Sequence, residues 1–152
     1  MRLPRAEHDL LRSLSEQLRP LLTGELDEPG VRRRLNPPAY EGAAEEAEYR
    51  ELVGDSLVAE RVAALDAFAR TLGGGTVRRG TWTVELDAGE AAAWLSTVND
   101  ARLVLGALQG ITTESDWEHG PDPEHPQSVA LYYLGLLEEE LVDALMGALP
   151  HD

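Results

Sequence analysis

One segment of the chain, residues 111–126, crowds together the side chain types that could hold a metal ion. Histidine nitrogen together with carboxylate oxygen suits zinc or manganese, and such a centre could activate water for hydrolysis. The spacing matches no specific ligand motif, and a segment rich in proline and glycine offers no second shell to fix ligands. We therefore expect a solvated acidic loop and assign no metal-ligating residue. The residues in question are Glu114, Asp116, Glu118, His119, Asp122, Glu124 and His125.

A second set of carboxylates lies on a predicted helix and could in principle pair for acid–base chemistry. Their spacing of about one helical turn is more typical of a solvent-facing surface. No nucleophile elbow, zinc-protease, Walker A or dinucleotide-binding pattern occurs. The sequence thus predicts no catalytic and no cofactor-binding residue, and we expect a protein that is not an enzyme. The carboxylates are those of Glu48, Glu51, Asp55, Glu60 and Asp66.

The arginines are few and unevenly placed. Against 28 acidic residues stand 13 basic ones, all of them Arg, which gives a formal net charge of −15. Residues 32–34 form the only run of three basic residues, in the nearly neutral first quarter of the chain. A chain of this charge repels the nucleic-acid backbone, which disfavours direct binding. Direct nucleic-acid binding through Arg32–Arg34, joined by Arg78 and Arg79, is therefore kept as an alternative to protein binding. Pairing of the run with the chain's own acidic surface is the simpler structural interpretation.

Three polar residues interrupt the middle of another predicted helix: Asn99, Asp100 and Arg102. Asn and Asp are weak helix formers at interior positions, and residues two apart do not face each other on a helix. We expect either a buried network, with Arg102 held by a carboxylate of another helix, or an exposed recognition surface.

The composition excludes further kinds of functional site and of protein. The chain contains no Cys, which rules out disulfides, iron–sulfur clusters and thiol chemistry. It has no apolar run long enough for a membrane helix, and its first residues, MRLPRAEHDLLRSL, do not read as a secretory signal. We therefore expect a cytoplasmic protein.

The elements that must position these residues follow from hydrophobic periodicity. Apolar residues recur with helical spacing in residues 6–22, 42–72, 87–109 and 127–149. Thr23 and Gly24 predict the end of the first helix, a bend or break is expected near residues 54–56, and Asp87 with Glu90 forms a capping-box pattern. We expect a single domain over residues 1–152, mainly α, as a bundle of four to five helices.

Two segments do not fit a helix. Residues 76–86 alternate apolar and polar side chains, which predicts a small β-hairpin-like insert. Residues 25–40 contain Pro29-Gly30 and Asn36-Pro37-Pro38, which predicts an irregular connection. The apolar stripe of the last helix is wider than one core requires, so self-association is a further expectation.

The order of two stretches carries a family resemblance. RRRLNPPAYEGAAEEAEYREL, residues 32–52, precedes WTVELDAGEAAAWLSTVNDARLVLG, residues 82–106. Together they resemble the actinobacterial domain-of-unknown-function family 2017, which includes AosR-like oxidative-stress transcriptional regulators. The most specific pieces are Trp94-Leu95 followed by residues 99–106, and then residues 37–40. The resemblance extends from Glu7 to Leu149.

The resemblance implies a cytosolic, mostly helical, non-enzymatic protein that acts on transcription through a partner sigma factor. The regulator-like members use a cysteine pair, which this chain lacks, so a thiol switch does not carry over. We expect a regulatory protein that binds a protein partner, with no cofactor, no metal and no membrane contact, and with a homodimer as an open alternative. The expected partner-binding residues are Arg32, Arg33, Arg34, Tyr40, Asn99, Asp100 and Arg102.

Overall fold

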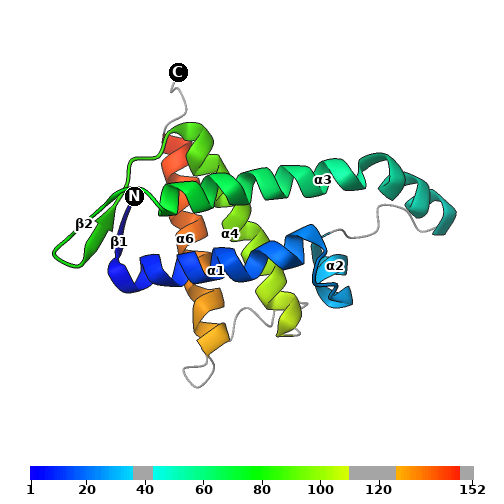
Figure 1. The fold of residues 1–152 in the computed structure, drawn as a ribbon, viewed down its shortest axis with the longest axis horizontal. Helices are drawn as coiled ribbons and strands as arrows, with labels where there is room; N and C mark the ends of the chain where they lie inside the picture. The colour runs from blue at the N-terminus through cyan, green and yellow to red at the C-terminus, as the bar shows by residue number, and fades with distance from the viewer. Residues whose placement is uncertain (36–42, 110–125, 148–152) are drawn as a thin grey trace.

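Five helices and three short strands make up the part of the chain that the structure, a computed structural model, describes: residues 1–35, 43–109 and 126–147. The predicted mainly α class with a small β element is confirmed (Figure 1). The helices are α1 (Arg5–Thr23), α2 (Pro29–Leu35), α3 (Ala43–Leu72), α4 (Ala88–Leu108) and α6 (Pro126–Gly147). The strands are β1 (Arg2–Pro4), β2 (Thr76–Arg78) and β3 (Thr81–Thr83).

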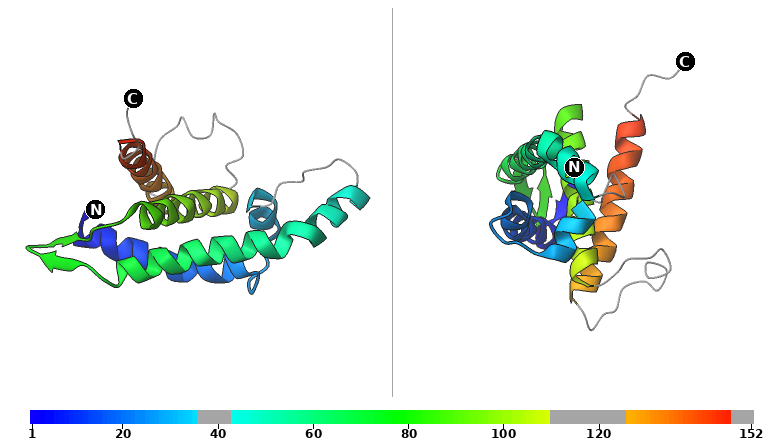
Figure 2. Two further views of the ribbon diagram at one scale, coloured as in Figure 1. Left: turned by 90° about the horizontal axis from the view of Figure 1, so that it is seen from above. Right: turned by 90° about the vertical axis from the view of Figure 1, so that its right-hand side faces the viewer.

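Helix α4 is the centre of the bundle. It packs against α6, α3 and α2, while α1 runs beside α3 (Figure 2). Trp94, Val98, Ala101 and Val104 recur at three- and four-residue steps, so they share one face of α4, and all are buried. Because α4 contacts all four other described helices, few of its side chains remain for external partners.

A stack of aromatic rings ties the sheet to the helices. Trp82 of β3 lies parallel to Trp94 of α4, with ring centroids 6.1 Å apart. Trp82 also contacts His8 of α1, with ring centroids 4.3 Å apart, and Phe68 of α3 meets Trp94 edge-on at 4.8 Å. Four elements therefore meet through side chains with large apolar areas and preferred mutual orientations.

The sheet differs from the predicted hairpin because a third strand joins it. The strand order is β1-β3-β2, all antiparallel, with Leu3 and Val77 both opposite Trp82. Sequence reasoning missed β1, since its three residues carry no period of their own and pair with a strand about eighty residues away. A two-stranded ribbon is marginal by itself, and the third strand explains how so short a hairpin persists.

Residues 29–35 are helix α2, so the prediction of an irregular connection there was wrong. Proline suits the first turn of a helix, where its missing N–H is not needed. The Glu28 carboxylate accepts a hydrogen bond from the Gly30 amide at 3.1 Å, which caps the start. Val31 and Leu35, one turn apart, are both buried. These local and packing contacts outweigh the turn signal of Pro29-Gly30.

The other helix limits agree better with expectation. Helix α1 ends at Gly24, whose φ of 83° is the left-handed conformation that glycine accepts. At the start of α4, Asp87 accepts from the Glu90 amide at 2.7 Å and Glu90 accepts from the Asp87 amide at 3.0 Å, which confirms the capping box. Of the two alternatives near residues 54–56, a bend or a break, the break does not occur, since α3 is one helix of 30 residues. The N-terminal part of α3 bends in Figure 1.

None of the helices in the described ranges has an apolar stretch of the length that a membrane crossing needs.

Gly75 and Gly80 offer a matched test of the sheet attachment. Both have positive φ, 74° and 78°, but a Cβ on Gly75 would lie 2.5 Å from the Thr83 carbonyl oxygen, whereas one on Gly80 would meet nothing within 4 Å. We expect Gly80→Ala to cost about 1 kcal/mol of unfolding free energy and Gly75→Ala to cost at least about 3 kcal/mol. Urea denaturation of the two variants measures the difference, and equal losses would contradict the close packing of β3 on residues 74–75.

Candidate interaction surfaces

Asp100 of α4 lies inside the protein and not on a surface. Its side chain is 8% exposed, and Oδ1 is 3.8 Å from Nε of Arg61 on α3. Arg61 also donates from Nη2 to the carbonyl oxygen of Leu35, the last residue of α2. One carboxylate and one guanidinium thus connect three helices. Sequence reasoning did not identify Arg61, since nothing in its neighbourhood marks it as the partner.

Arg102 pairs with Glu138 of α6 through its Nη1 atom. Both side chains are mostly buried, and the Arg102 guanidinium packs over Gly135, where a Cβ would approach it to 3.5 Å. This contact is the carboxylate from another helix that the sequence predicted as the structural role of Arg102. It fixes α6 against α4 and leaves the pair at the margin of a surface hollow.

The expected partner-binding residues in the described ranges differ in exposure and do not all face solvent. Asn99 is exposed while its neighbour Asp100 is buried, because consecutive residues point about 100° apart on a helix. Arg32 and Arg33 are exposed on α2, and Arg34 is half-buried. Arg32 donates to both oxygens of Asp27 at 3.2 and 3.3 Å, so it pairs with the chain's own acidic surface. Tyr40 lies outside the described residues.

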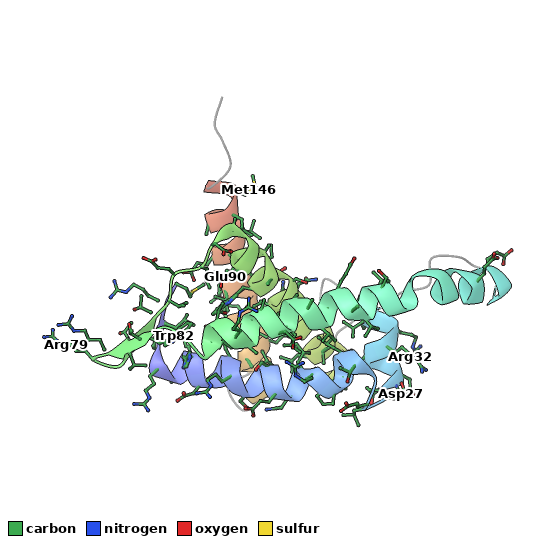
Figure 3. The ribbon with its side chains drawn as sticks, turned by 45° about the horizontal axis from the view of Figure 1, so that its top comes forward. Asp27, Arg32, Arg79, Trp82, Glu90 and Met146 are labelled. Carbon is green, nitrogen blue, oxygen red and sulfur yellow. The ribbon has the colours of Figure 1, made fainter. Side chains whose placement is uncertain are left out.

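The two arginine groups that were considered for nucleic-acid binding also lie apart. Arg78 ends β2 and Arg79 follows in the turn, whereas Arg32–Arg34 are on α2. The 19 residues of α1 separate the sheet from α2, a helix length of about 28 Å. Figure 3 shows Arg79 and Arg32 at opposite ends of the molecule. They cannot form one surface.

One of the carboxylates considered for acid–base chemistry, Asp66, has a described partner. Asp66 forms an ion pair with Arg19 of α1 at 2.8 Å, with both side chains well exposed. Within the described ranges, no three His, Asp or Glu side chains approach closely enough to share a metal ion. The acidic loop with His119 and His125 lies outside the described residues, so the metal alternative stays a hypothesis.

The outer face of α6 is hollowed. An open hollow of about 680 Å³ runs along it. Apolar Leu131, Tyr132, Leu136 and Val142 line it together with Gly135, Arg102 and the carboxylates of Glu138, Glu139 and Asp143. The sequence pointed to this face through its wide apolar stripe, but not to the hollow, which Arg102 of α4 also lines.

Burial also perturbs two titrating groups. Desolvation raises the pKa of Asp100 above its ordinary 3.8, and the charge of Arg61 lowers it by a smaller amount. Desolvation likewise raises the pKa of the Tyr133 hydroxyl, and the charges of Glu7 and Glu140 raise it further. Within the described residues, neither group lies beside other side chains that could act with it in catalysis. We therefore interpret both pKa shifts as consequences of packing.

The raised pKa of Asp100 gives a pH test of the buried network. Because the folded chain binds this proton more tightly than the unfolded chain, the associated stability is complete below pH 3.8 and is lost as the pH rises through the raised pKa. We expect the unfolding free energy of Asp100→Asn, relative to wild type, to increase over that window. Urea titrations from pH 4 upward measure it, with the exposed Glu16→Gln as the control for losing one negative charge. A relative stability of Asp100→Asn that falls with pH would contradict the burial.

Comparison with known proteins leaves the function open. No curated protein and no solved structure matches the chain significantly. A family does match, and it spans every described helix and strand almost to the end of α6. Over residues 1–145 the chain matches the domain of unknown function DUF2017, and it therefore belongs to that family.

Proposed function

We propose that this chain is a non-enzymatic regulatory protein of the cytoplasm that acts by binding another protein through the outer face of α6. The observation that carries the proposal is where exposed apolar side chains gather. Nine large hydrophobic side chains are exposed in the described ranges, and five of them lie on this one helix. They are Val129, Tyr132, Leu136, Val142 and Met146. Exposed apolar patches rimmed by polar groups are typical of protein interaction sites.

Helical geometry gathers these side chains on the side away from the core. Leu134, Leu137 and Leu141 of α6 are buried against the bundle. Tyr132 and Leu136 are one turn apart and point to the opposite side, where they line the hollow together. The apolar surface continues toward α1 through Val129, which shares a shallow depression with Leu10 and Tyr133. A helix of a partner could lie along such a groove.

Charge defines the chemistry of the partner. Helix α6 carries Glu138, Glu139, Glu140 and Asp143 and no basic residue. Glu139 and Asp143 are exposed one turn apart and border the apolar part of the hollow. We infer an amphipathic helix whose apolar stripe is flanked by Lys or Arg, because opposite charges across an interface select the partner and speed association.

A second copy of the chain fits this face less well. Each copy has a formal net charge of −15, and pairing two α6 helices would bring together two helices that carry four carboxylates each and no basic residue. Like charges across an interface disfavour association. We therefore favour a basic partner over the homodimer.

The regulatory context comes from the resemblance to AosR-like proteins of actinobacteria. Membership of the DUF2017 family supports it, together with the stretch from Trp94 to Gly106. On this basis we propose that the partner belongs to the transcription machinery, with a sigma factor as the first candidate, and that the protein serves the response to oxidative stress. Without Cys, the chain would respond through binding and abundance and not through a thiol.

A designed peptide tests the α6 face directly. The probe is an 18-residue helix-forming peptide with Leu on one face and Lys on the flanks, titrated by calorimetry. We expect Leu136→Ala to weaken binding by about 10-fold, the loss expected for exposing one Leu side chain of the interface. Leu108→Ala is the matched control, since Leu108 is 50% exposed and Leu136 is 53% exposed; it should change the affinity less than twofold.

Charge variants and the oligomeric state complete that test. Glu139→Gln with Asp143→Asn should weaken binding, and the loss should shrink at 0.5 M salt as screening grows. The peptide with Glu in place of Lys should not bind. Equal effects of Leu136→Ala and Leu108→Ala would contradict the proposal, as would a dimer of the free chain that Leu136→Ala dissociates.

Transcript profiling tests the regulatory context. We expect deletion of the gene to change the transcripts induced by peroxide, and Leu136→Ala to reproduce the change at normal protein level. A profile identical to wild type in both strains would contradict a role in stress-dependent transcription.

A further inference from the structure

The face of the sheet that points away from the helices carries arginine and threonine side chains. In an antiparallel sheet, residues that are directly paired lie on the same face, and alternate residues of a strand share a face. Thr83 pairs with Arg2 and Thr76, and Thr81 pairs with Pro4 and Arg78. Trp82, between the two threonines, is buried against the helices. Arg2 and Arg78 thus project outward from the two edge strands.

The turn adds further positive charge. Arg79 and Gly80 both have positive φ, 53° and 78°, which is the geometry of a tight hairpin turn. Arg79 is exposed at its tip (Figure 3). The backbone amide of Arg5 donates to the Gly80 carbonyl at 2.9 Å, so a fourth arginine begins beside the turn.

These arginines are available for a ligand. None of the four forms an ion pair with a described residue, in contrast to Arg19, Arg32 and Arg102. An open hollow of about 640 Å³ on this face is lined by arginine and threonine alone: Arg2, Arg78, Arg79, Thr81 and Thr83. Guanidinium groups and hydroxyls are hydrogen-bond donors that suit phosphate oxygens, and no carboxylate competes within the hollow.

We propose that this sheet face binds the phosphate backbone of a nucleic-acid duplex. The extent of the face favours a backbone over a single small phosphate, because Arg2 and Arg78 lie on strands two spacings apart, about 10 Å. A duplex presents several phosphates over that distance. The outer face of the sheet presents no aromatic side chain that could stack on a base. Because the proposed contacts are made to phosphates, we expect binding without sequence preference.

The acidic body does not cancel this local charge. The hairpin projects from the end of the helical bundle (Figures 1 and 2), and charges farther away than the Debye length of about 10 Å at 0.1 M salt are largely screened. Glu7 faces α6, where it borders a depression with Val129 and Tyr133. Glu85, exposed two residues beyond Thr83, is the acidic residue that follows the face along β3. It provides a variant that should strengthen binding.

The test is fluorescence anisotropy of a labelled 20-base-pair DNA duplex with the full chain. Three phosphate contacts predict a slope of about −2.7 for log K against log salt, or about a 40-fold loss between 50 and 200 mM. Arg78→Gln with Arg79→Gln should reduce affinity at 50 mM salt at least 10-fold and bring the slope toward about −1. Arg32→Gln with Arg33→Gln removes the same charge from α2 and should change affinity less than twofold. Glu85→Gln should increase it about twofold.

Several outcomes would overturn the proposal. If the wild-type chain does not bind the duplex at 50 mM salt, the site is excluded. If the two double arginine variants lose equal affinity, the binding depends on net charge and not on this sheet face. Displacement of the duplex by micromolar pyrophosphate would assign the face to a small phosphate ligand. Competition by polyglutamate as effective as by unlabelled duplex would assign it to an acidic protein segment. The proposal does not depend on the α6 face, and Leu136→Ala should leave duplex binding unchanged.

Discussion

The stacking of Trp82 on Trp94 is the contact on which the rest of the structure depends. Each indole has a polar N–H that needs a partner when buried. Trp82 donates to the Gly74 carbonyl at 2.9 Å, and Trp94 donates to the Thr71 hydroxyl at 2.7 Å. Both acceptors lie at the end of α3 or just past it, so the pair fixes where α3 stops and where the sheet begins. His8 closes the stack from α1 and bonds the Leu72 carbonyl at 2.8 Å.

Around this stack, two charged side chains of α4 make contacts inside the protein. Asp100 faces α3 and Arg102 faces α6, so two charges that are neighbours in sequence hold different helices. A buried charge is tolerated only with a partner, which explains why each meets an opposite charge from another element. The two surfaces that we propose for other molecules are accordingly peripheral: the outer face of α6 and the outward face of the sheet.

These two surfaces have opposite character. The α6 face combines apolar side chains with carboxylates, and the sheet face combines arginines with threonines. The net charge of −15 is a sum over the whole chain, so it does not reveal the local composition of either surface. A regulator that joins a basic protein helix to a nucleic acid would need such a separation, because one mixed surface would pair with itself. The spacing of the arginines along the sequence hides this, as strand pairing brings Arg2 near Arg78.

The sequence by itself determined the features that arise within a few residues. The stop at Gly24 and the capping box of Asp87 and Glu90 are made by backbone conformation and hydrogen bonds across three residues, and the apolar stripes define helices α1, α4 and α6. Only the tertiary structure decided the features that join distant residues. Strand β1 exists because β3 lies beside it, α2 forms because Val31 and Leu35 are buried, and Arg61 matters because Asp100 is 3.8 Å away. The physical reason is that such contacts gain their free energy from burial and from neutralised charge between elements, and no local pattern records which elements will meet.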